Sequence, residues 1–245
     1  MTTVAAALAA IDALPVHPPE ALLAAGPLLV LAPHPDDESL GCGGLIAAAV
    51  QRGTPPMVVI VTDGGMSHPN SRAYPRRRLR ATREAEARAA VAALGLPPDR
   101  IAFLGLRDAE TPASGPEFDA AVTVIASLAL RIDARTVLAT WQHDPHWDHQ
   151  STHLMAAAAA RDAGLRHVAY PVWGLTLPPA ALLPGPLPTG MRIDVEPYLV
   201  QKRRAIAAHR TQIGGVIVDD PSGFTLPPEF LMLFDRPFEI VLDVP

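Results

Sequence analysis

The sequence predicts an α/β fold: a doubly wound, mainly parallel, Rossmann-like sheet with helices on both faces and an irregular, proline-rich C-terminal third. Two observations predict the sheet. Short continuous apolar runs alternate along the chain with longer alanine- and leucine-rich segments. Uninterrupted apolar runs are typical of parallel strands buried on both faces, and helices between them supply the cover. The second observation is that clusters of polar residues directly follow these runs, where the binding sites of such sheets lie.

The expected elements follow in order. Apolar runs predict strands at residues 28–32, 57–62, 101–106, 136–141 and 167–173. The segments between them predict helices at residues 39–52, 75–94, 116–131 and 151–163. Gly95 and Gly164 follow two of these helices, and glycine is the usual residue just past a helix end. The alanine-rich start, residues 1–15, lacks the basic residues of a signal peptide and indicates a short capping helix.

The last third of the chain is less regular. Many of the 27 prolines lie between residues 171 and 197, which predicts a long ordered loop because proline removes a backbone donor. A helix at 197–209 and a final strand at 238–242 are expected after it. A chain of 245 residues that is 49% hydrophobic can bury one large core, so we expect one domain over residues 1–245.

Composition bears on the partners and on the compartment. The net charge is −5 and no uninterrupted apolar stretch reaches about 18 residues, so we expect neither nucleic-acid binding nor a membrane span. The arginines of residues 72–88 are interleaved with glutamates, as on a solvated helix face. The single cysteine, Cys42, permits no intrachain disulfide and is expected to be a small buried hydrophobe. A cytoplasmic protein is expected, and the oligomeric state stays open.

Two polar clusters carry the expected chemistry. His34, Asp36, Asp37 and Glu38 follow the first strand, and the segment 143–149 follows the fourth. Imidazole and carboxylate groups are the ligands of catalytic zinc sites, which keep one position open for water. Helix capping is the alternative reading, but it accounts for one acid and not for the whole cluster. The sequence therefore predicts a metal site between these two loops.

The motifs themselves are unusual. His34-Pro35-Asp36-Asp37-Glu38 and His146-Trp147-Asp148-His149 resemble the two signature motifs of the LmbE-like, or PIG-L, family of zinc-dependent N-deacetylases. Between them, Thr62-Asp63-Gly64-Gly65 resembles the family's second loop. Arg83 and Glu86, followed by Leu94-Gly95, resemble the family's R-x-x-E helix, which runs into a Leu-Gly pair. The resemblance extends from about residue 28 to residue 163.

The resemblance implies a reaction and a role for each motif residue. It implies removal of an N-acetyl or other N-acyl group from an amino-sugar-like small molecule. It implies Zn²⁺, with Fe²⁺ as the alternative in the cell, held by His34, Asp37 and His149. Asp36 would be the general base that activates the attacking water. His146 would be the cation that stabilises the oxyanion, and Asp148 would orient His146 and raise its pKa.

Two positions depart from the family pattern. Trp147 stands where relatives usually have proline, which predicts a changed loop shape. Arg107-Asp108 stands where relatives often have Pro-Asp, which could alter contacts with the substrate. His153, four residues after His149, has the spacing of a second zinc-binding histidine, but packing on the helix is the favoured reading.

Candidates for contact with the substrate are His68, Arg83, Trp147 and His209. His68 is equally well read as a loop residue. The tryptophans at 141, 147 and 173 come at or after strand ends, where an aromatic ring could stack on a sugar, although Trp173 could equally fill the core.

Two other functions remain open at this point. One is a metal-dependent amide hydrolase or acyl-transfer enzyme that acts on a non-sugar small molecule. The other is a sugar- or nucleotide-binding protein without catalysis, which would not need both metal loops intact.

Overall fold

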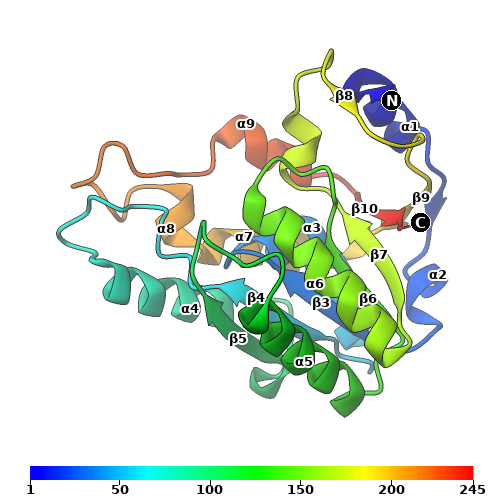
Figure 1. Cartoon of the computed structure of the whole chain (residues 1–245), viewed down its shortest axis with the longest axis horizontal. Coiled ribbons are helices and arrows are strands. Elements are labelled where there is room, and N and C mark those ends of the chain that lie inside the picture. The colour runs from blue at the N-terminus through cyan, green and yellow to red at the C-terminus, as the bar shows by residue number, and fades with distance from the viewer. Residues whose placement is uncertain (245) are drawn as a thin grey trace.

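A mixed sheet of eight strands forms the centre of the protein in a computed structural model that describes residues 1–244 (Figure 1). The strand order is β2-β9-β10-β7-β6-β3-β4-β5. Their bounds are Val16–His17 (β2), Leu28–Ala32 (β3), Met57–Thr62 (β4), Ile101–Leu106 (β5), Thr136–Thr140 (β6), Arg166–Tyr170 (β7), Gly190–Asp194 (β9) and Phe238–Asp243 (β10). All pairings are parallel except those of β10, which runs antiparallel to β7 and β9. The predicted mainly parallel α/β fold is confirmed.

Helices cover both faces of the sheet. The main ones are α3 (Asp37–Gln51), α4 (Arg76–Ala93), α5 (Pro116–Arg131), α6 (Trp147–Ala163) and α7 (Leu199–Ala208). Alternate strand residues point to opposite faces, so Val30 packs in one core with α3, α4 and α7, whereas Leu29 and Leu31 pack in another with α5 and α6. Short elements complete the chain: β1 (Thr2–Thr3), α1 (Val4–Asp12), α2 (Glu20–Leu23), β8 (Leu182–Leu183), α8 (Arg210–Ile213) and α9 (Pro228–Leu231).

The strand order places the two polar loops side by side. From β3 the chain continues to β4 and β5 on one side, and then returns to form β6 on the other side of β3. The carboxyl ends of β3 and β6 are therefore neighbours at a topological switch point, where open α/β sheets leave a crevice for ligands. The loops after β3 and β6 both begin there.

Several elements differ from the expected ones, and three of the differences are informative. Helix α6 begins at Trp147 rather than at 151, because the His146 ring accepts the backbone N–H of Asp148 and caps the helix four residues earlier. Strand β7 ends at Tyr170 rather than at 173. The expected loop at 171–197 contains β9, which is held between β2 and β10, so neighbouring strands outweigh the local proline content.

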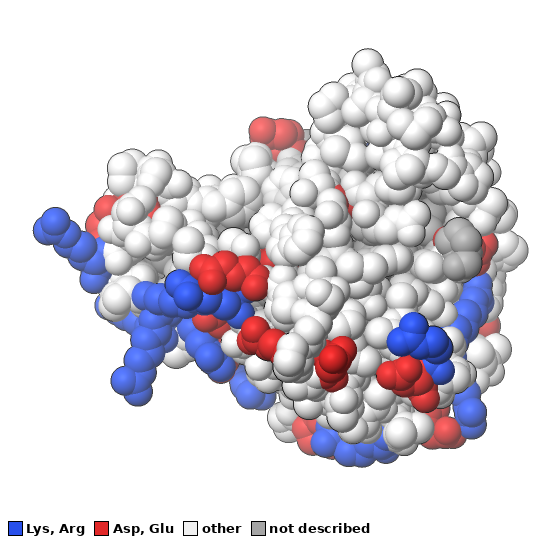
Figure 2. Space-filling model, in the orientation of Figure 1, with Lys and Arg blue, Asp and Glu red and all other residues white. Residues whose placement is uncertain are grey.

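The arginines of α4 gather at one end of the molecule, at the lower left in Figure 2. Arg77, Arg78, Arg80 and Arg88 are exposed, as expected for a solvated helix face, but Arg83 is buried. Within residues 1–244, no helix combines the length and the apolar character needed to cross a membrane.

A second buried cation lies on α7. Lys202, the only lysine of the sequence, is 1% exposed, and its Nζ donates to Glu239 Oε1 over 2.7 Å. The Glu239 carboxylate also accepts the backbone N–H groups of Gly44 and Leu45 in the middle of α3. This pair joins α7 and β10 to α3.

Candidate metal centre

Three of the predicted ligands converge at the switch point. His34 follows β3, Asp37 begins α3, and His149 lies in the first turn of α6. Asp37 Oδ2 lies 3.3 Å from His34 Nδ1 and 3.4 Å from His149 Nε2. Ligands about 2.0–2.1 Å from a tetrahedral ion are about 3.3–3.4 Å apart, so both distances fit one shared ion. His149 Nε2 is buried without a hydrogen-bond partner, and a metal ion would satisfy it.

Carboxylates face the remaining nitrogen of each imidazole. His34 Nε2 lies 2.9 Å from Asp148 Oδ2 and 3.3 Å from Asp108 Oδ1. His149 Nδ1 lies 2.8 Å from Asp144 Oδ2. Such carboxylates fix the ring orientation and the tautomer of metal-binding histidines. Contacts of Asp144 and Asp108 with the metal-ligand candidates were not predicted, although both residues lie in loops that follow strands at this edge of the sheet.

The electrostatics of the cluster favour a cation. Burial alone would lower the pKa of His149, but Asp37 and Asp144 outweigh it and raise that pKa to about 9. Burial likewise opposes protonation of His34, whose pKa the surrounding carboxylates raise well above its usual value. Burial would raise the pKa of Asp37, but His149 and His34 hold it well below its ordinary range. The negative potential that retains these protons would equally hold a divalent metal ion.

His146 lies beside the ligands, with its ring centre 4.7 Å from that of His34 and 5.5 Å from that of His149. Ligand atoms of these three histidines lie within 4.8 Å of one another. His146 Nδ1 accepts the Asp148 backbone N–H, so in the neutral ring the proton sits on Nε2. His146 lines the pocket. It is therefore placed to donate a hydrogen bond from Nε2.

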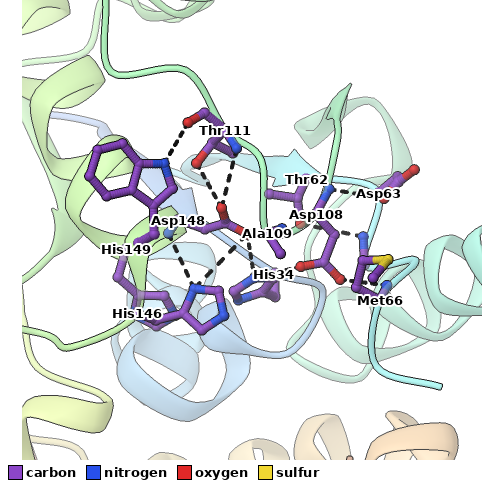
Figure 3. Close-up of polar contacts among 12 residues, drawn as sticks. His34, Thr62, Asp63, Met66, Asp108, Ala109, Thr111, His146, Asp148 and His149 are labelled. Atoms are coloured by element: carbon purple, nitrogen blue, oxygen red, sulfur yellow. Dashed lines mark hydrogen bonds and ion pairs between the residues drawn. The ribbon is translucent and has the colours of Figure 1, made fainter. Parts of the chain in front are cut away.

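The expected role of Asp148 needs correction. Its carboxylate lies 4.0 Å from His146 Nδ1 but 2.9 Å from His34 Nε2, and it also accepts from Ala109 N and from Thr111 (Figure 3). Burial lowers the pKa of His146, as do His34 and His149, and Asp148 does not reverse that shift. The Asp148 carboxylate therefore lies closer to His34, a metal-ligand candidate, and its upward effect on the pKa of His146 is outweighed.

Asp36 occupies a strained backbone position next to Asp37. Its φ of 154° and ψ of −29° lie outside the regions that L-residues favour, at a cost of order 1–3 kcal/mol. Its backbone N–H donates to Glu38 Oε2 over 3.0 Å, and its Oδ2 accepts from Arg83 Nη2 over 3.2 Å. Burial raises the pKa of Asp36 to about 6, although the Arg83 charge opposes the shift. The surrounding contacts hold one buried carboxylate at the pocket wall.

Glu38 joins this turn to the C-terminal part of the chain. Glu38 Oε1 accepts from Ser39 Oγ and lies 2.9 Å from Nε2 of His209, between α7 and α8. His209 is 1% exposed and does not line the pocket, so its expected contact with the substrate is wrong. Burial lowers the pKa of His209, but the Glu38 charge outweighs it and raises the value. His209 acts below the pocket wall, on the residue that holds Asp36.

The other three candidates for substrate contact divide as follows. Arg83 lines the pocket, where it also donates to the carbonyls of Pro35 and Gly64. His68 is buried next to Ser67 and packs against Gly223, outside the pocket lining. Trp147 is exposed, and its indole N–H donates to the Thr111 carbonyl away from the pocket lining. The expectations for His68 and Trp147 are therefore not supported by their positions.

One cavity of about 630 Å³ lies next to the candidate metal ligands. His34, Asp36, Asp37, Asp108 and His146 form its polar floor. Of the tryptophans, only Trp173 contributes to the lining; Trp141 is buried against His143. His153 is also accounted for by packing, since its Nδ1 lies 3.0 Å from the Thr140 carbonyl oxygen and its ring lies against His167.

Comparison with known proteins agrees with the resemblance. The family model of GlcNAc-PI de-N-acetylase, PIG-L, matches residues 29–160. The 1D-myo-inositol 2-acetamido-2-deoxy-alpha-D-glucopyranoside deacetylase of Nocardia farcinica is 30% identical over 248 residues, which covers 78% of this chain and 81% of the relative.

Solved structures share the fold. The conserved protein TT1542 from Thermus thermophilus superimposes with a TM-score of 0.63 at 24% identity, covering 89% of this chain and 94% of that one. The N,N'-diacetylchitobiose deacetylase from Pyrococcus horikoshii gives 0.65 at 22% identity, with 93% and 86% covered. GalB, a 4-carboxy-2-hydroxymuconate hydratase from Pseudomonas putida, gives 0.57 at 21% identity, so the fold alone does not define the reaction. The match to the family model and the 30%-identical relative are more specific than the shared fold. They show that this chain belongs to the PIG-L, or GlcNAc-PI de-N-acetylase, family.

Proposed function

We propose that this protein is a metal-dependent hydrolase that removes an N-acetyl or other N-acyl group from an amino-sugar-like small molecule. One observation carries the proposal. Two imidazole nitrogens lie about one tetrahedral edge from a single oxygen of Asp37, and Asp36 and His146 line the same cavity. The relatives support the substrate class, since one is a deacetylase of an acetamido-deoxy-glucopyranoside and another of diacetylchitobiose.

We propose Zn²⁺ as the metal, held by His34, Asp37 and His149, with Fe²⁺ as the alternative in the cell. Two imidazoles and one carboxylate suit either ion and leave a position open. When bound, the ion supplies Lewis acidity, which makes water a better nucleophile and a carbonyl a better electrophile.

The surrounding side chains perform the proton transfers. Asp36 accepts a proton from the water whose oxygen attacks the amide carbonyl carbon. His146 donates a hydrogen bond from Nε2 to the oxyanion that forms. The C–N bond then breaks, and the proton held by Asp36 passes to the departing nitrogen. The products are a carboxylic acid and a free amine, and Asp36 is returned to its starting state.

The whole chain fits this activity as one domain. Strand β2, near the N-terminus, and β10, near the C-terminus, belong to the same sheet, which supports a single domain over residues 1–245. The chain has one cysteine, Cys42, which is free and buried, and this supports a reducing, cytoplasmic setting. The proposed partner is the small-molecule substrate.

The experiment is a panel of N-acetylated compounds incubated with the metal-free protein and with the Zn²⁺-loaded protein, with free amine as the readout. The panel contains N-acetylglucosamine, its glycosides, nucleotide-linked forms and N-acetylated amino acids. We expect Zn²⁺-dependent release of amine from the sugars, and its loss in Asp36→Asn at unchanged zinc content. Release of amine from the N-acetylated amino acids alone would mean that the substrate is a non-sugar amide. Loss of zinc in Asp36→Asn would mean that Asp36 is the metal ligand and that Asp37 is the general base.

A further inference from the structure

Part of the pocket wall is apolar, and two of its four residues, Met66 and Phe224, are exposed to solvent. It is formed by Met66 after β4, Trp173 after β7, and Phe224 and Leu226 in the segment before α9. Phe224 is 42% exposed and Met66 is 40% exposed, although both are large hydrophobic residues. Exposed apolar side chains that meet in a cavity are typical of a binding surface. We call these four residues the apolar wall.

The apolar wall is held in place by its own packing. The Trp173 ring stacks on Phe230, with ring centres 3.9 Å apart and planes inclined by 14°. Phe224 meets the Trp173 ring edge to face, with centres 5.7 Å apart. One face of Trp173 is therefore covered by the protein, so its orientation is fixed before any ligand arrives. Such rigidity reduces the entropy lost on binding.

Hydrogen bonds fix the segment that carries Phe224. Phe224 N donates to the Ser67 carbonyl, and Leu226 N donates to the Gln212 carbonyl. Asp219 and Asp220 accept backbone N–H groups from residues 70, 72 and 73, and Asp219 also accepts from the Ser71 hydroxyl. These bonds tie residues 219–226 to the loop after β4, which also contributes Met66.

Ser67 and Arg83, two other polar residues of the lining, have hydrogen-bond partners, although Arg83 Nε is buried without one. Ser67 Oγ accepts from Gln212 Nε2 and lies 3.1 Å from His68 Nδ1. The Arg83 guanidinium donates to two carbonyls and to Asp36. Against this one neutralised guanidinium, three carboxylates line the cavity: Asp36, Asp37 and Asp108. The only arginine of this lining is paired with Asp36, so a phosphate or carboxylate on the substrate would be repelled by the three carboxylates.

We propose that the apolar wall is a subsite for an uncharged apolar group of the substrate, an aryl or alkyl substituent on the N-acylated amino sugar. The enzyme then selects lipophilic amino-sugar derivatives over phosphorylated or nucleotide-linked ones. The inference rests on the proposed function and narrows its substrate class. Burial of such a group against the wall raises kcat/KM by about 10- to 100-fold.

The test compares four substrates of the Zn²⁺-loaded enzyme. N-acetylglucosamine is the reference, its phenyl glycoside carries the apolar group at the anomeric position, N-octanoylglucosamine carries it in the acyl group, and N-acetylglucosamine 1-phosphate carries charge. We expect one of the two apolar compounds to exceed the reference about 10- to 100-fold in kcat/KM, mainly through KM, and the phosphate to fall at or below it. The better compound identifies which end of the sugar faces the wall.

Variants locate the effect. Phe224→Ala should remove most of the advantage of the apolar substrate, so kcat/KM should fall much further for the apolar substrate than for the reference. Met232→Ala is the matched control, because Met232 is an apolar side chain of the same C-terminal part, 72% exposed and outside the lining; it should change neither rate. Equal rates for the apolar and reference substrates, a preference for the phosphate, or an equal loss on all substrates in Phe224→Ala would overturn the proposal.

Binding separates this proposal from the reaction itself. If the wild type released no amine from any of the four, the proposed function would fail, and calorimetric titration with phenyl glucosaminide and with glucosamine would still decide on the subsite. Tighter binding of the phenyl compound by wild type, reduced in Phe224→Ala, supports the wall. Equal binding of the two compounds overturns it.

Discussion

Residues 28–163 and residues 164–244 contribute differently to the pocket. The first region supplies the candidate metal ligands, Asp36 and His146 on loops that follow parallel strands. The second region contributes Trp173, Gln212, Phe224 and Leu226 to the wall, and none of these is ionisable. The residues of the proposed reaction therefore lie in two short motifs of the first region, whereas the second region supplies most of the proposed apolar wall, to which the first region adds Met66.

Two contacts join the regions at the centre. Asp144 holds His149 and also accepts the backbone N–H groups of Val172 and Gly174. His209 reaches the Asp36 turn through Glu38. We therefore expect effects of three sizes. Variants of the metal-ligand candidates and of His146 should abolish the reaction, and variants of the joining contacts should weaken it. Variants at the contact between His153 and His167 should change only the stability.

The largest effect is expected for His149→Ala. Loss of one of three ligands should release the metal and lower kcat/KM by about 10⁴-fold or more, since the Lewis acid is lost. Metal content by plasma emission spectroscopy and the rate should fall together. If the variant kept one equivalent of metal and most of its activity, His149 would not be a metal ligand, and the proposed metal centre in the first region would be wrong.

His146→Ala should separate chemistry from metal binding within the first region. Removal of the Nε2 donor should lower kcat by about 10²–10³-fold, the usual loss for one oxyanion donor, with metal content unchanged. Steady-state kinetics on a metal-matched sample measures this. A change confined to KM would make His146 a substrate contact and not a donor in the reaction.

Glu38→Ala tests whether the joining contact acts on Asp36. Loss of the acceptor for the Asp36 N–H should let the strained turn relax and lower kcat by about 10- to 100-fold at unchanged KM and metal content. Glu38→Gln retains an acceptor oxygen and should recover most of the rate.

The matched control is the buried pair of Lys202 on α7 and Glu239 on β10, which also contacts α3. The double variant Lys202→Met, Glu239→Gln removes a pair that contacts the middle of α3 and not Asp36. It should lower the melting temperature without lowering kcat. If it lowered kcat as much as Glu38→Ala does, Glu38 would support the fold in general rather than Asp36.

Asp144→Asn weakens the second joining contact. The loss of charge behind His149 should reduce metal affinity by about 10- to 100-fold while the enzyme remains active at saturating zinc. Competition with a chelator gives the affinity directly. An unchanged affinity would mean that Asp144 serves only the backbone of residues 172–174.

The smallest effect is expected at the seam between His153 and His167. Burial, and then the neighbouring His153, lower the pKa of His167 to about 4. The unfolded chain takes up this proton near pH 6.5 and the folded protein only near 4, so stability falls as the pH drops through that window. From pH 7 to pH 5 the part due to His167 should be about 1–2 kcal/mol, discounted for partial exposure. Urea unfolding should show that His167→Gln loses less free energy of unfolding from pH 7 to pH 5 than the wild type does, with activity at pH 7 unchanged. Equal losses in the two proteins would mean that other groups cause the pH dependence.

The same division decides what could be predicted from the sequence. In the first region, continuous apolar runs predicted β3, β4 and β5 with their observed bounds, and contiguous motifs predicted the convergence of His34, Asp37 and His149. Local signals suffice there because each polar residue lies in the loop or the first helical turn after its strand.

The second region depends on contacts between distant residues. β9 forms because β2 and β10 flank it, and no local pattern in the proline-rich segment indicates this. The partner of His209 lies 171 residues earlier, so sequence position alone suggested a contact with the substrate. The role of Asp148 failed for a similar reason: nearness in sequence to His146 did not reveal that His34 lies closer to its carboxylate.

The burial of Lys202 has a practical consequence for the assays above that detect the release of amine. It is the only lysine of the sequence, it is 1% exposed, and its Nζ is bound to Glu239. Reagents that detect free amines by acylation or imine formation therefore find no lysine on the folded surface. The amine product can be measured with the enzyme present at high concentration and little background from its side chains. Slow labelling of Lys202, in turn, would count the openings of the fold around α7 without a spectroscopic probe.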